Sequence, residues 1–187
     1  MAAEFPFLEG SHQEFIKRQQ MFFVATAPLS EQGHVNLSPK GYDTFRILSE
    51  RQVAYLDVTG SGNETSAHLL ENGRITIMFI AYEGNPMILR LYGRGRVILP
   101  NSAEWESMSQ HFELIPSVRQ IIVMDILLVK TSCGCSIPEY DYVKDRDNLK
   151  NWATKRGEQK LNQYRREYNS YSMDGLPTPL GLNLQNK

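Results

Sequence analysis

Hydrophobic and polar positions alternate along the chain in runs that predict strands joined by turns. In Val53–Val58, the residues Val53, Tyr55 and Asp57 alternate with the apolar Ala54, Leu56 and Val58, as in a half-buried strand. Gln120–Thr131 is apolar at nearly every position, which indicates a strand covered on both faces. Further strands are expected at Met21–Ala27, His34–Pro39, Arg74–Ile80 and Met87–Leu99. Because few long helices separate these strands, the pattern favours a mainly β fold, a mixed antiparallel barrel rather than a doubly wound sheet.

A glycine loop, Gly60–Gly62, follows the Val53–Asp57 strand and opens onto a short helix that ends at Gly73. Ser61 and Glu64 have capping-box spacing, and Asn63 is a rival cap. A helix N-terminus of this kind exposes unpaired N–H groups and is a seat for an anion, above all phosphate. A well-capped turn without a ligand is an equally good interpretation. The loop has no P-loop lysine and no third glycine of a dinucleotide fingerprint.

Other segments complete the expected architecture. Capping boxes predict helices from Ser11 to about Gln20 and from Asn101 to about Phe112. Gly41–Glu50 is expected to be a loop. The polar segment Asp147–Tyr168 is expected to be helical, and Ser170–Lys187 extended or disordered. We therefore expect a barrel over residues 1–138 and a helical and extended appendage of the same unit over 139–187.

Composition narrows the classes of function. The 187 residues are 41% hydrophobic and 22% charged, with a net charge of −1, which is typical of one soluble globular unit. This near-neutral balance argues against nucleic acid or an anionic membrane as the main partner. We see no signal peptide and no membrane-spanning run. Cys133 and Cys135 are too close in sequence for an easy disulfide, so a reducing, cytoplasmic setting is the default expectation.

Four motifs together resemble those of a known family. They are Gly33–Gly41, Gly60–Leu69, Glu71–Thr76 and Arg90–Gly95. Over about Phe15–Pro138 the chain resembles the pyridoxamine 5′-phosphate oxidase-like proteins, the FMN-binding split barrels, and its tail is similar to a bacterial branch of them. The resemblance implies a split β-barrel with a C-terminal helical extension, FMN as cofactor, and a homodimer that buries two flavins between its subunits.

The resemblance also implies cofactor-binding residues. Asn36 and Ser38 would line the flavin ring, and Lys40 would lie near the FMN phosphate, although a solvated turn lysine is the alternative. Thr65 and Ser66 stand where the vitamin oxidase has an Arg-Lys pair, so hydroxyls replace two charges. The set is completed by residues of the flanking loop and strand, Thr59 and Arg90. For Arg90, a solvated outer face is at least as good an interpretation.

The expected function is an FMN-dependent oxidoreductase acting on a small molecule, with NADH or NADPH as the candidate electron donor. The flavin carries the hydride chemistry, so no catalytic residue is assigned, and no metal site is expected. Pyridoxine and pyridoxamine 5′-phosphate are not expected as substrates, because no arginine follows Arg166 and no tryptophan follows Trp152. The alternatives are a non-catalytic flavin carrier or sensor, and a haem-binding split barrel with His111 or His68 as iron ligand.

Overall fold

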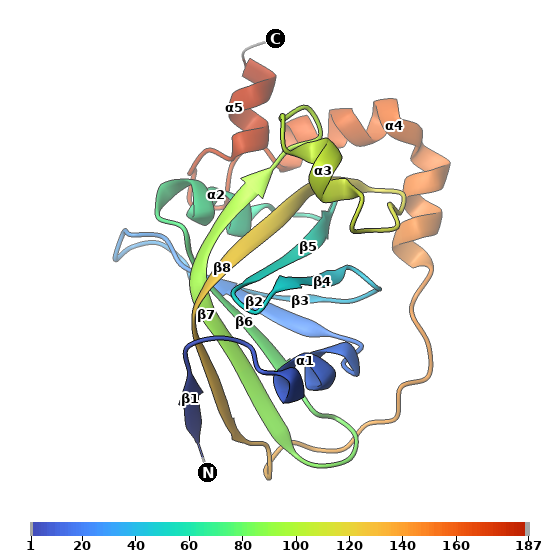
Figure 1. The fold of residues 1–187 in the computed structure, drawn as a ribbon. Coiled ribbons are helices and arrows are strands. Elements are labelled where there is room, and N and C mark those ends of the chain that lie inside the picture. Colours follow the sequence, from blue (N-terminus) through green and yellow to red (C-terminus); the bar gives the residue numbers. More distant parts are fainter. Residues whose placement is uncertain (1, 186–187) are drawn as a thin grey trace.

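Eight strands form a strongly curved antiparallel sheet with helices at its rims (Figure 1). The computed structural model describes residues 2–185. The strands are β1 (Ala3–Phe5), β2 (Phe22–Thr26), β3 (Asn36–Lys40), β4 (Phe45–Ser49), β5 (Gln52–Val58), β6 (Arg74–Ile80), β7 (Met87–Ile98) and β8 (Val118–Cys133). Their order in the sheet is β3-β2-β6-β7-β8-β5-β4, and β1 pairs with β8. The mainly β, split-barrel expectation is confirmed.

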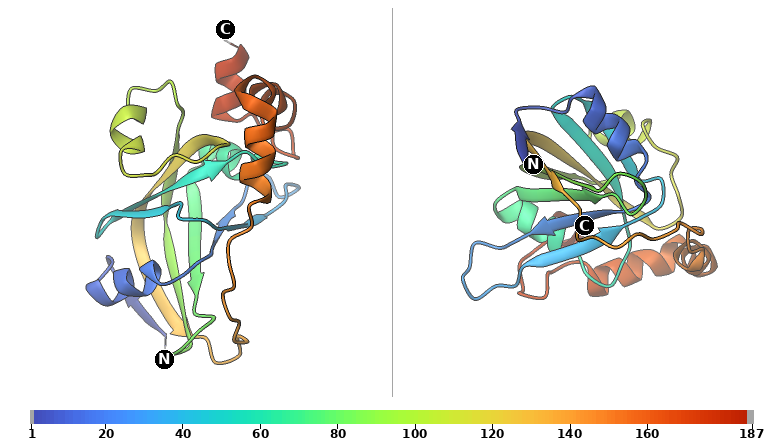
Figure 2. Two further views of the ribbon diagram at one scale, coloured as in Figure 1. Left: turned by 90° about the vertical axis from the view of Figure 1, so that its right-hand side faces the viewer. Right: turned by 90° about the horizontal axis from the view of Figure 1, so that it is seen from below.

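Within residues 2–185, five helices accompany the sheet: α1 (Gly10–Lys17), α2 (Glu64–Glu71), α3 (Trp105–Ser109), α4 (Asn148–Tyr168) and α5 (Pro179–Gln185). Helices α4 and α5 lie together on one side of the barrel, at the end to which β5 points (Figure 2). A linker without regular secondary structure, residues 134–147, runs from the end of β8 to α4. No helix within the described residues is long and apolar enough to cross a membrane.

The main core fills the inside of the curved sheet. Aromatic rings meet at its centre, where Phe22 lies 5.1 Å from Phe45 and 5.4 Å from Tyr55 between ring centroids. The first half of β8, Arg119–Met124, is buried at every residue, as the apolar run predicted, but Asp125 and Leu127 in its second half are exposed, so the run is not covered on both faces throughout. Strand β5 is buried from Val53 to Asp57 rather than on one face only, because Val53 and Tyr55 pack in the main core while Ala54 and Leu56 pack in a second apolar cluster. The alternation of polar residues in β5 therefore marks buried polar groups, not a solvated face.

Three predicted elements differ in the structure. Gly41–Glu50 contains strand β4, because Phe45 and Ile47 pack on the core while the backbone pairs with β5. The helix expected at Asn101–Phe112 is limited to α3. The tail is ordered at least as far as Gln185, where it forms α5. Thr178, just before this helix, is fully buried, and its hydroxyl donates to the Asn169 carbonyl.

Helices α1 and α2 begin at cap residues other than those that the sequence first indicated. Helix α1 begins after Glu9, which forms a reciprocal capping box with His12, so Ser11 is already inside the helix. Helix α2 begins after Asn63, the rival cap. Gly73 has a φ of +69° and follows α2 as predicted. The left-handed backbone there explains why a glycine ends this helix.

Candidate functional site

A cavity of about 520 Å³ lies between β3, the loop after β5 and the first turn of α2. This β3–α2 cavity brings together five of the seven residues predicted to bind a cofactor, although β3 and α2 are far apart in sequence. They are Asn36, Ser38, Lys40, Thr59 and Thr65. Its volume is within the usual range for small-molecule sites, about 300–1,000 Å³. Ser66 and Arg90 do not line it.

A buried carboxylate organises the cationic side of the cavity. Asp57 accepts from Lys40 Nζ at 3.1 Å, from Arg119 Nε at 2.8 Å and from Gln120 Nε2 at 2.7 Å. Burial alone would raise the pKa of Asp57, but the charges of Arg119 and Lys40, with the hydrogen bonds, hold that pKa well below its ordinary value. Asp57 is therefore ionised at neutral pH and fixes both cationic groups at the cavity wall.

The first turn of α2 has no side-chain cap. Asn63 is the cap residue, yet its side chain makes no hydrogen bond to the helix. Its amide nitrogen instead donates to the Asn169 carbonyl at 3.0 Å, and its oxygen accepts from Gln120 at 2.9 Å. The first N–H groups of a helix have no partner within the helix, so this diversion leaves them for an anion in the cavity.

Hydrogen bonding orients the hydroxyl groups beside that turn. The amide of Asn36 donates to Thr65 Oγ1 at 2.9 Å and to Thr26 Oγ1 at 3.2 Å. Thr26 Oγ1 lies 2.9 Å from His68 Nδ1. Burial lowers the pKa of His68, so the ring is neutral and shares one hydrogen bond with the Thr26 hydroxyl through Nδ1. Thr65 accepts from Asn36, and the neighbouring buried hydroxyl of Tyr55 competes with a ligand in the cavity for the Thr65 proton.

Ser38 is the second hydroxyl donor on the cavity wall. Its Oγ is buried and has no hydrogen-bond partner within the described residues. An unpartnered buried hydroxyl costs free energy unless a ligand or water satisfies it. The position of Ser38 on β3, two residues from Lys40, therefore points to a polar ligand.

One acidic side chain opposes an anion here. Glu64, the first residue of α2, lines the cavity and folds back over Gly62, where it fills the space that a Cβ would need. Glycine at position 62 therefore lets this carboxylate approach the loop. Its charge partly offsets those of Lys40 and Arg119.

The C-terminal appendage holds the loop from behind. Arg165 of α4 is buried; its Nε donates to Thr59 Oγ1 at 2.8 Å, and its Nη2 donates to the Val118 carbonyl at 3.1 Å. Asn169 Nδ2 donates to the Gly60 carbonyl at 3.0 Å. Thr59 also donates to the Ser117 carbonyl, so its hydroxyl is engaged on both sides. The appendage thus positions the glycine loop and is part of the site's construction.

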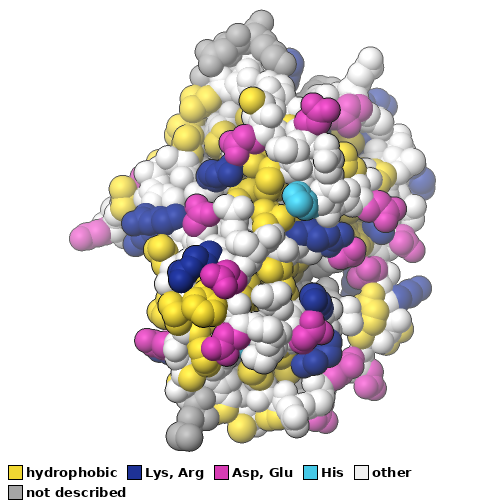
Figure 3. All heavy atoms as spheres, viewed as in Figure 1, with side chains coloured by type: hydrophobic (Ala, Val, Ile, Leu, Met, Phe, Trp, Pro, Cys, Tyr) yellow, Lys and Arg dark blue, Asp and Glu magenta, His cyan; other side chains and the backbone are white. Residues whose placement is uncertain are grey.

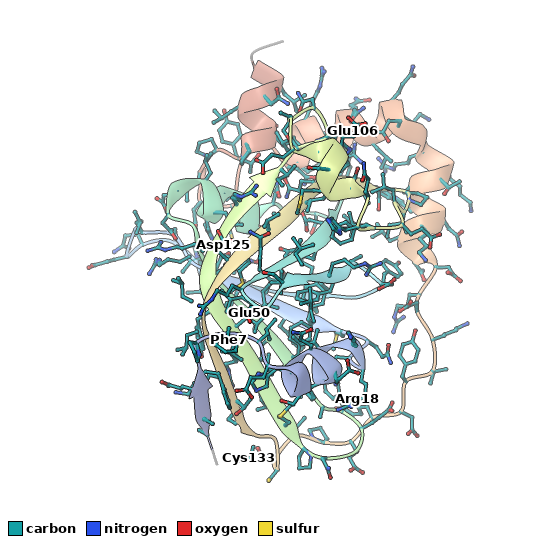
Figure 4. All side chains as sticks on the ribbon, in the orientation of Figure 1. Phe7, Arg18, Glu50, Glu106, Asp125 and Cys133 are labelled. Atoms are coloured by element: carbon teal, nitrogen blue, oxygen red, sulfur yellow. The ribbon has the colours of Figure 1, made fainter. Side chains whose placement is uncertain are left out.

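The remaining candidates lie elsewhere. Ser66 is buried and donates to Gln120, and Arg90 donates to Ser132 on the neighbouring strand. His111 is exposed, and Cys133 is an exposed free thiol at the end of β8 (Figure 4). Within the described residues no cluster of three metal-ligating side chains occurs.

Sequence reasoning missed the charged and amide groups behind the cavity: Asp57, Arg119, Gln120, Arg165 and Asn169. One signal was available. Asp57 is an acidic residue within a strand whose other inward positions are apolar, and such a carboxylate needs cationic partners. Arg119 lies immediately before the apolar run of β8, but its partner comes from a strand 62 residues earlier. Arg165 and Asn169 gave no local signal, because only the packing of α4 brings them to the loop.

Comparison with known proteins agrees with the fold and the motifs. The family model for pyridoxamine 5′-phosphate oxidase matches residues 8–133. The chain belongs to this family. The pyridoxamine 5′-phosphate oxidase family protein ustO of Aspergillus flavus is 35% identical over 189 residues, covering 91% of this chain and 75% of that protein.

Two solved structures share the fold at low sequence identity. A single-residue variant of Group A Streptococcus HupZ has a TM-score of 0.52 at 17% identity, covering 66% of this chain and 98% of that one. A putative pyridoxamine 5′-phosphate oxidase from Lactobacillus delbrueckii has a TM-score of 0.51 at 12% identity, and the match covers 67% of this chain and 94% of that one. Helices α4 and α5 lie outside the residues that the family model matches, whereas the match to ustO covers 91% of this chain.

Proposed function

We propose that the protein is an FMN-dependent oxidoreductase that holds the phosphate end of FMN in the β3–α2 cavity. The observation that carries this proposal is the convergence on one cavity of two cationic side chains, Lys40 and Arg119, with the uncapped N-terminus of α2. Charge-assisted donors and helix N–H groups are the usual protein ligands of phosphate. Membership of the pyridoxamine 5′-phosphate oxidase family supports a flavin as the ligand.

The residues present fit such a group. Thr65 lines the cavity with a hydroxyl that accepts from Asn36 and adjoins the Tyr55 hydroxyl, and Ser38 Oγ lacks a hydrogen-bond partner within the described residues. Both are hydroxyl donors on the cavity wall. They offset the absence of the Arg-Lys pair at positions 65 and 66. The neutral hydroxyls make the site less cationic than that pair would, and the two cations, Lys40 and Arg119, face two carboxylates, Asp57 and Glu64.

Bound FMN would supply hydride transfer through its isoalloxazine ring. The protein's own contribution is binding and orientation. Lys40, fixed by Asp57, and the loop held by Arg165 keep the phosphate end in place, and a fixed phosphate fixes the rest of the cofactor. Such chemistry needs no acid or base from the protein in its simplest form.

We also propose a homodimer. Strand β3 is at one edge of the sheet, and Leu37 on it is 62% exposed. An exposed apolar edge beside the proposed flavin site is a natural surface for a second copy. The first half of β8 is buried within the chain itself, but Leu127 in its second half is 65% exposed.

Pyridoxine and pyridoxamine 5′-phosphate are poor substrates in this proposal. The tail after Tyr168 contains neither arginine nor tryptophan and packs on the glycine loop through Asn169. A phosphorylated vitamer would lack the cationic clamp that positions it. Oxidation of either vitamer at about 10 per second, the median enzyme value, would contradict this point.

Anaerobic reduction tests the oxidoreductase assignment. The FMN-loaded protein is mixed with NADPH or NADH, and the flavin absorbance near the visible maximum is followed after re-exposure to oxygen or to a dye acceptor. Bleaching by one donor and reoxidation by the acceptor are expected. Bound flavin that neither donor reduces would favour the non-catalytic carrier.

A further inference from the structure

A second cavity, of about 980 Å³, lies between the barrel and the linker 134–147. This linker cavity is bounded by the end of α1, the turn between β6 and β7, and the linker itself. It shares Gly41 and Tyr42 with the β3–α2 cavity. Arg18, at the end of α1, is one of its lining residues and lies on the side of the barrel along which the linker runs (Figure 4).

Defined contacts hold the linker in place as a wall. The Tyr140 amide donates to the Tyr82 carbonyl at 3.0 Å, and the two rings lie 5.5 Å apart. The Tyr142 amide donates to Glu83 Oε1 at 3.1 Å. The Tyr42 hydroxyl donates to the Arg146 carbonyl at 2.7 Å. The linker is thus attached to the β6–β7 turn and to the end of β3, and the space beneath it is a constructed cavity.

Aromatic side chains dominate the apolar lining of this cavity. Four tyrosines contribute, from three different segments: Tyr42, Tyr82, Tyr140 and Tyr142. Phe15 of α1 adds a buried ring. Tyrosine offers a large flat face together with a polar end, so such a lining recognises a planar aromatic ligand by stacking.

The charges around the cavity balance. Three cationic side chains line it, and so do three carboxylates: Arg18, Lys144 and Arg146, and Glu83, Asp141 and Asp145. Within residues 2–185 none of these six makes an ion pair. Figure 3 likewise shows both signs of charge interspersed over the face it presents. A ligand with a large net charge gains nothing here, whereas an uncharged or zwitterionic one can use donors of both signs.

Tyr42 lines both cavities. Its φ is +60°, a left-handed backbone that a bulky residue rarely adopts. The Lys150 ammonium lies 4.7 Å from the centre of its ring. The surroundings therefore hold this ring in place from both the linker and α4. Strained positions of this kind concentrate at functional sites.

We propose that the linker cavity binds the substrate, a small planar aromatic compound without net charge, and presents it to the flavin across Tyr42. The proposal that the linker cavity binds such a compound rests on the geometry of this cavity alone. The presentation to flavin rests on the proposed function of the β3–α2 cavity. The substrate then enters from the linker side, while the cofactor phosphate stays at α2.

Ligand-observed NMR tests the binding part on flavin-free protein. L-Phenylalanine is the probe. Three control compounds are compared with it: L-cyclohexylalanine, which is not aromatic, phenylacetate, which is an anion, and phenethylamine, which is a cation. Saturation transfer is expected for L-phenylalanine, with at least tenfold weaker binding of the other three. Tyr82→Leu is expected to weaken L-phenylalanine binding about tenfold, and Tyr168→Leu, an exposed tyrosine of α4 outside the cavity, to leave it unchanged. Equal binding of the four probes, no binding of any, or equal effects of the two variants would overturn the assignment.

A second measurement separates this inference from the proposed function. L-Phenylalanine is titrated into the FMN-loaded protein while the visible flavin spectrum is recorded. A saturable spectral shift with the same dissociation constant as in the NMR experiment is expected. Binding without any spectral shift would overturn the presentation across Tyr42. A protein that binds L-phenylalanine but no flavin would refute the proposed function and leave the aromatic site standing.

Discussion

Asn36 and Thr65 join the edge strand to the helix: the Asn36 amide donates to Thr65 Oγ1 at 2.9 Å. The same amide contacts Thr26, whose hydroxyl lies beside His68 Nδ1. The contact therefore does more than tie β3 to α2. It holds the Thr65 hydroxyl at the first turn of α2, on the wall of the β3–α2 cavity.

Thr65→Val is expected to weaken FMN binding about fivefold, since a net neutral hydrogen bond contributes about 1 kcal/mol. Riboflavin, which lacks the phosphate, is expected to bind the variant and the parent alike. Fluorescence titration with both flavins measures this. Thr154→Val, an exposed threonine of α4, is the control. A loss of equal size for both flavins would show that Thr65 does not face the phosphate.

Lys40 and Glu64 carry opposite charges in the cavity, so removing one or the other is expected to change FMN affinity in opposite directions. Lys40→Met removes a charge-assisted contact of about 1.5–3 kcal/mol and is expected to weaken FMN binding by about ten- to a hundredfold. Glu64→Gln removes the carboxylate over Gly62 and is expected to strengthen FMN binding. Titration of both variants at low salt checks the signs. Two changes in the same direction would contradict the placement of the phosphate between these side chains.

Arg165→Leu is expected to reduce both stability and FMN affinity, because it leaves Thr59 and the Val118 carbonyl without a buried charged donor. A loss of about 2 kcal/mol is expected for such bonds, which corresponds to a melting temperature lower by roughly 4–8 °C in a chain of this size. Arg166→Leu, at the neighbouring exposed arginine, is the control. Thermal unfolding followed by circular dichroism measures both. A variant as stable as the control would mean that the appendage does not support the loop.

The depressed pKa of Asp57 predicts a specific acid response. The unfolded carboxyl has a pKa of 3.8 and the folded one is lower, so the contribution of Asp57 to stability is present above about pH 4 and is lost as the pH falls below it. Asp57→Asn is expected to cost about 3 kcal/mol at neutral pH, because Lys40 and Arg119 lose their buried partner. Urea unfolding between pH 2 and pH 7 is the measurement. The difference between parent and variant should shrink below pH 4, and a constant difference would contradict the ionised state of Asp57.

His68 predicts a second, separate pH window. Burial lowers its pKa below 6.5, so the unfolded chain binds a proton that the folded chain does not, and stability falls as the pH drops below about 6.5. His68→Gln keeps an acceptor for Thr26 and cannot titrate. Its stability curve is expected to be flatter than the parent's just below pH 6.5. Parallel curves would show that His68 takes up a proton in the folded state.

The local part of the fold was predictable from sequence, and the long-range part was not. The loop Gly60–Gly62, the stop at Gly73 and the strand of Arg74–Ile80 follow from local backbone preference and periodicity, and the structure has them there. Strand β4 was missed because its pairing with β5 and the burial of Phe45 decide it, not its own pattern.

The candidate site shows the same division. Five predicted residues line one cavity because β3 and the glycine loop carry recognisable motifs. Asp57 and Arg119 meet only through the pairing of β5 with β8. Ser66 was expected at the ligand by its position beside Thr65, but one residue along a helix turns a side chain by about 100°, and it faces Gln120.

Identification of the bound molecule tests the central claim most directly. The protein is purified, denatured and filtered, and the released compound is identified by absorbance and mass; protein purified without colour is first incubated with FMN. The account predicts FMN, one per chain, with affinity lowered in Lys40→Met. Release of FAD or haem, or no binding even after FMN is added, would contradict it.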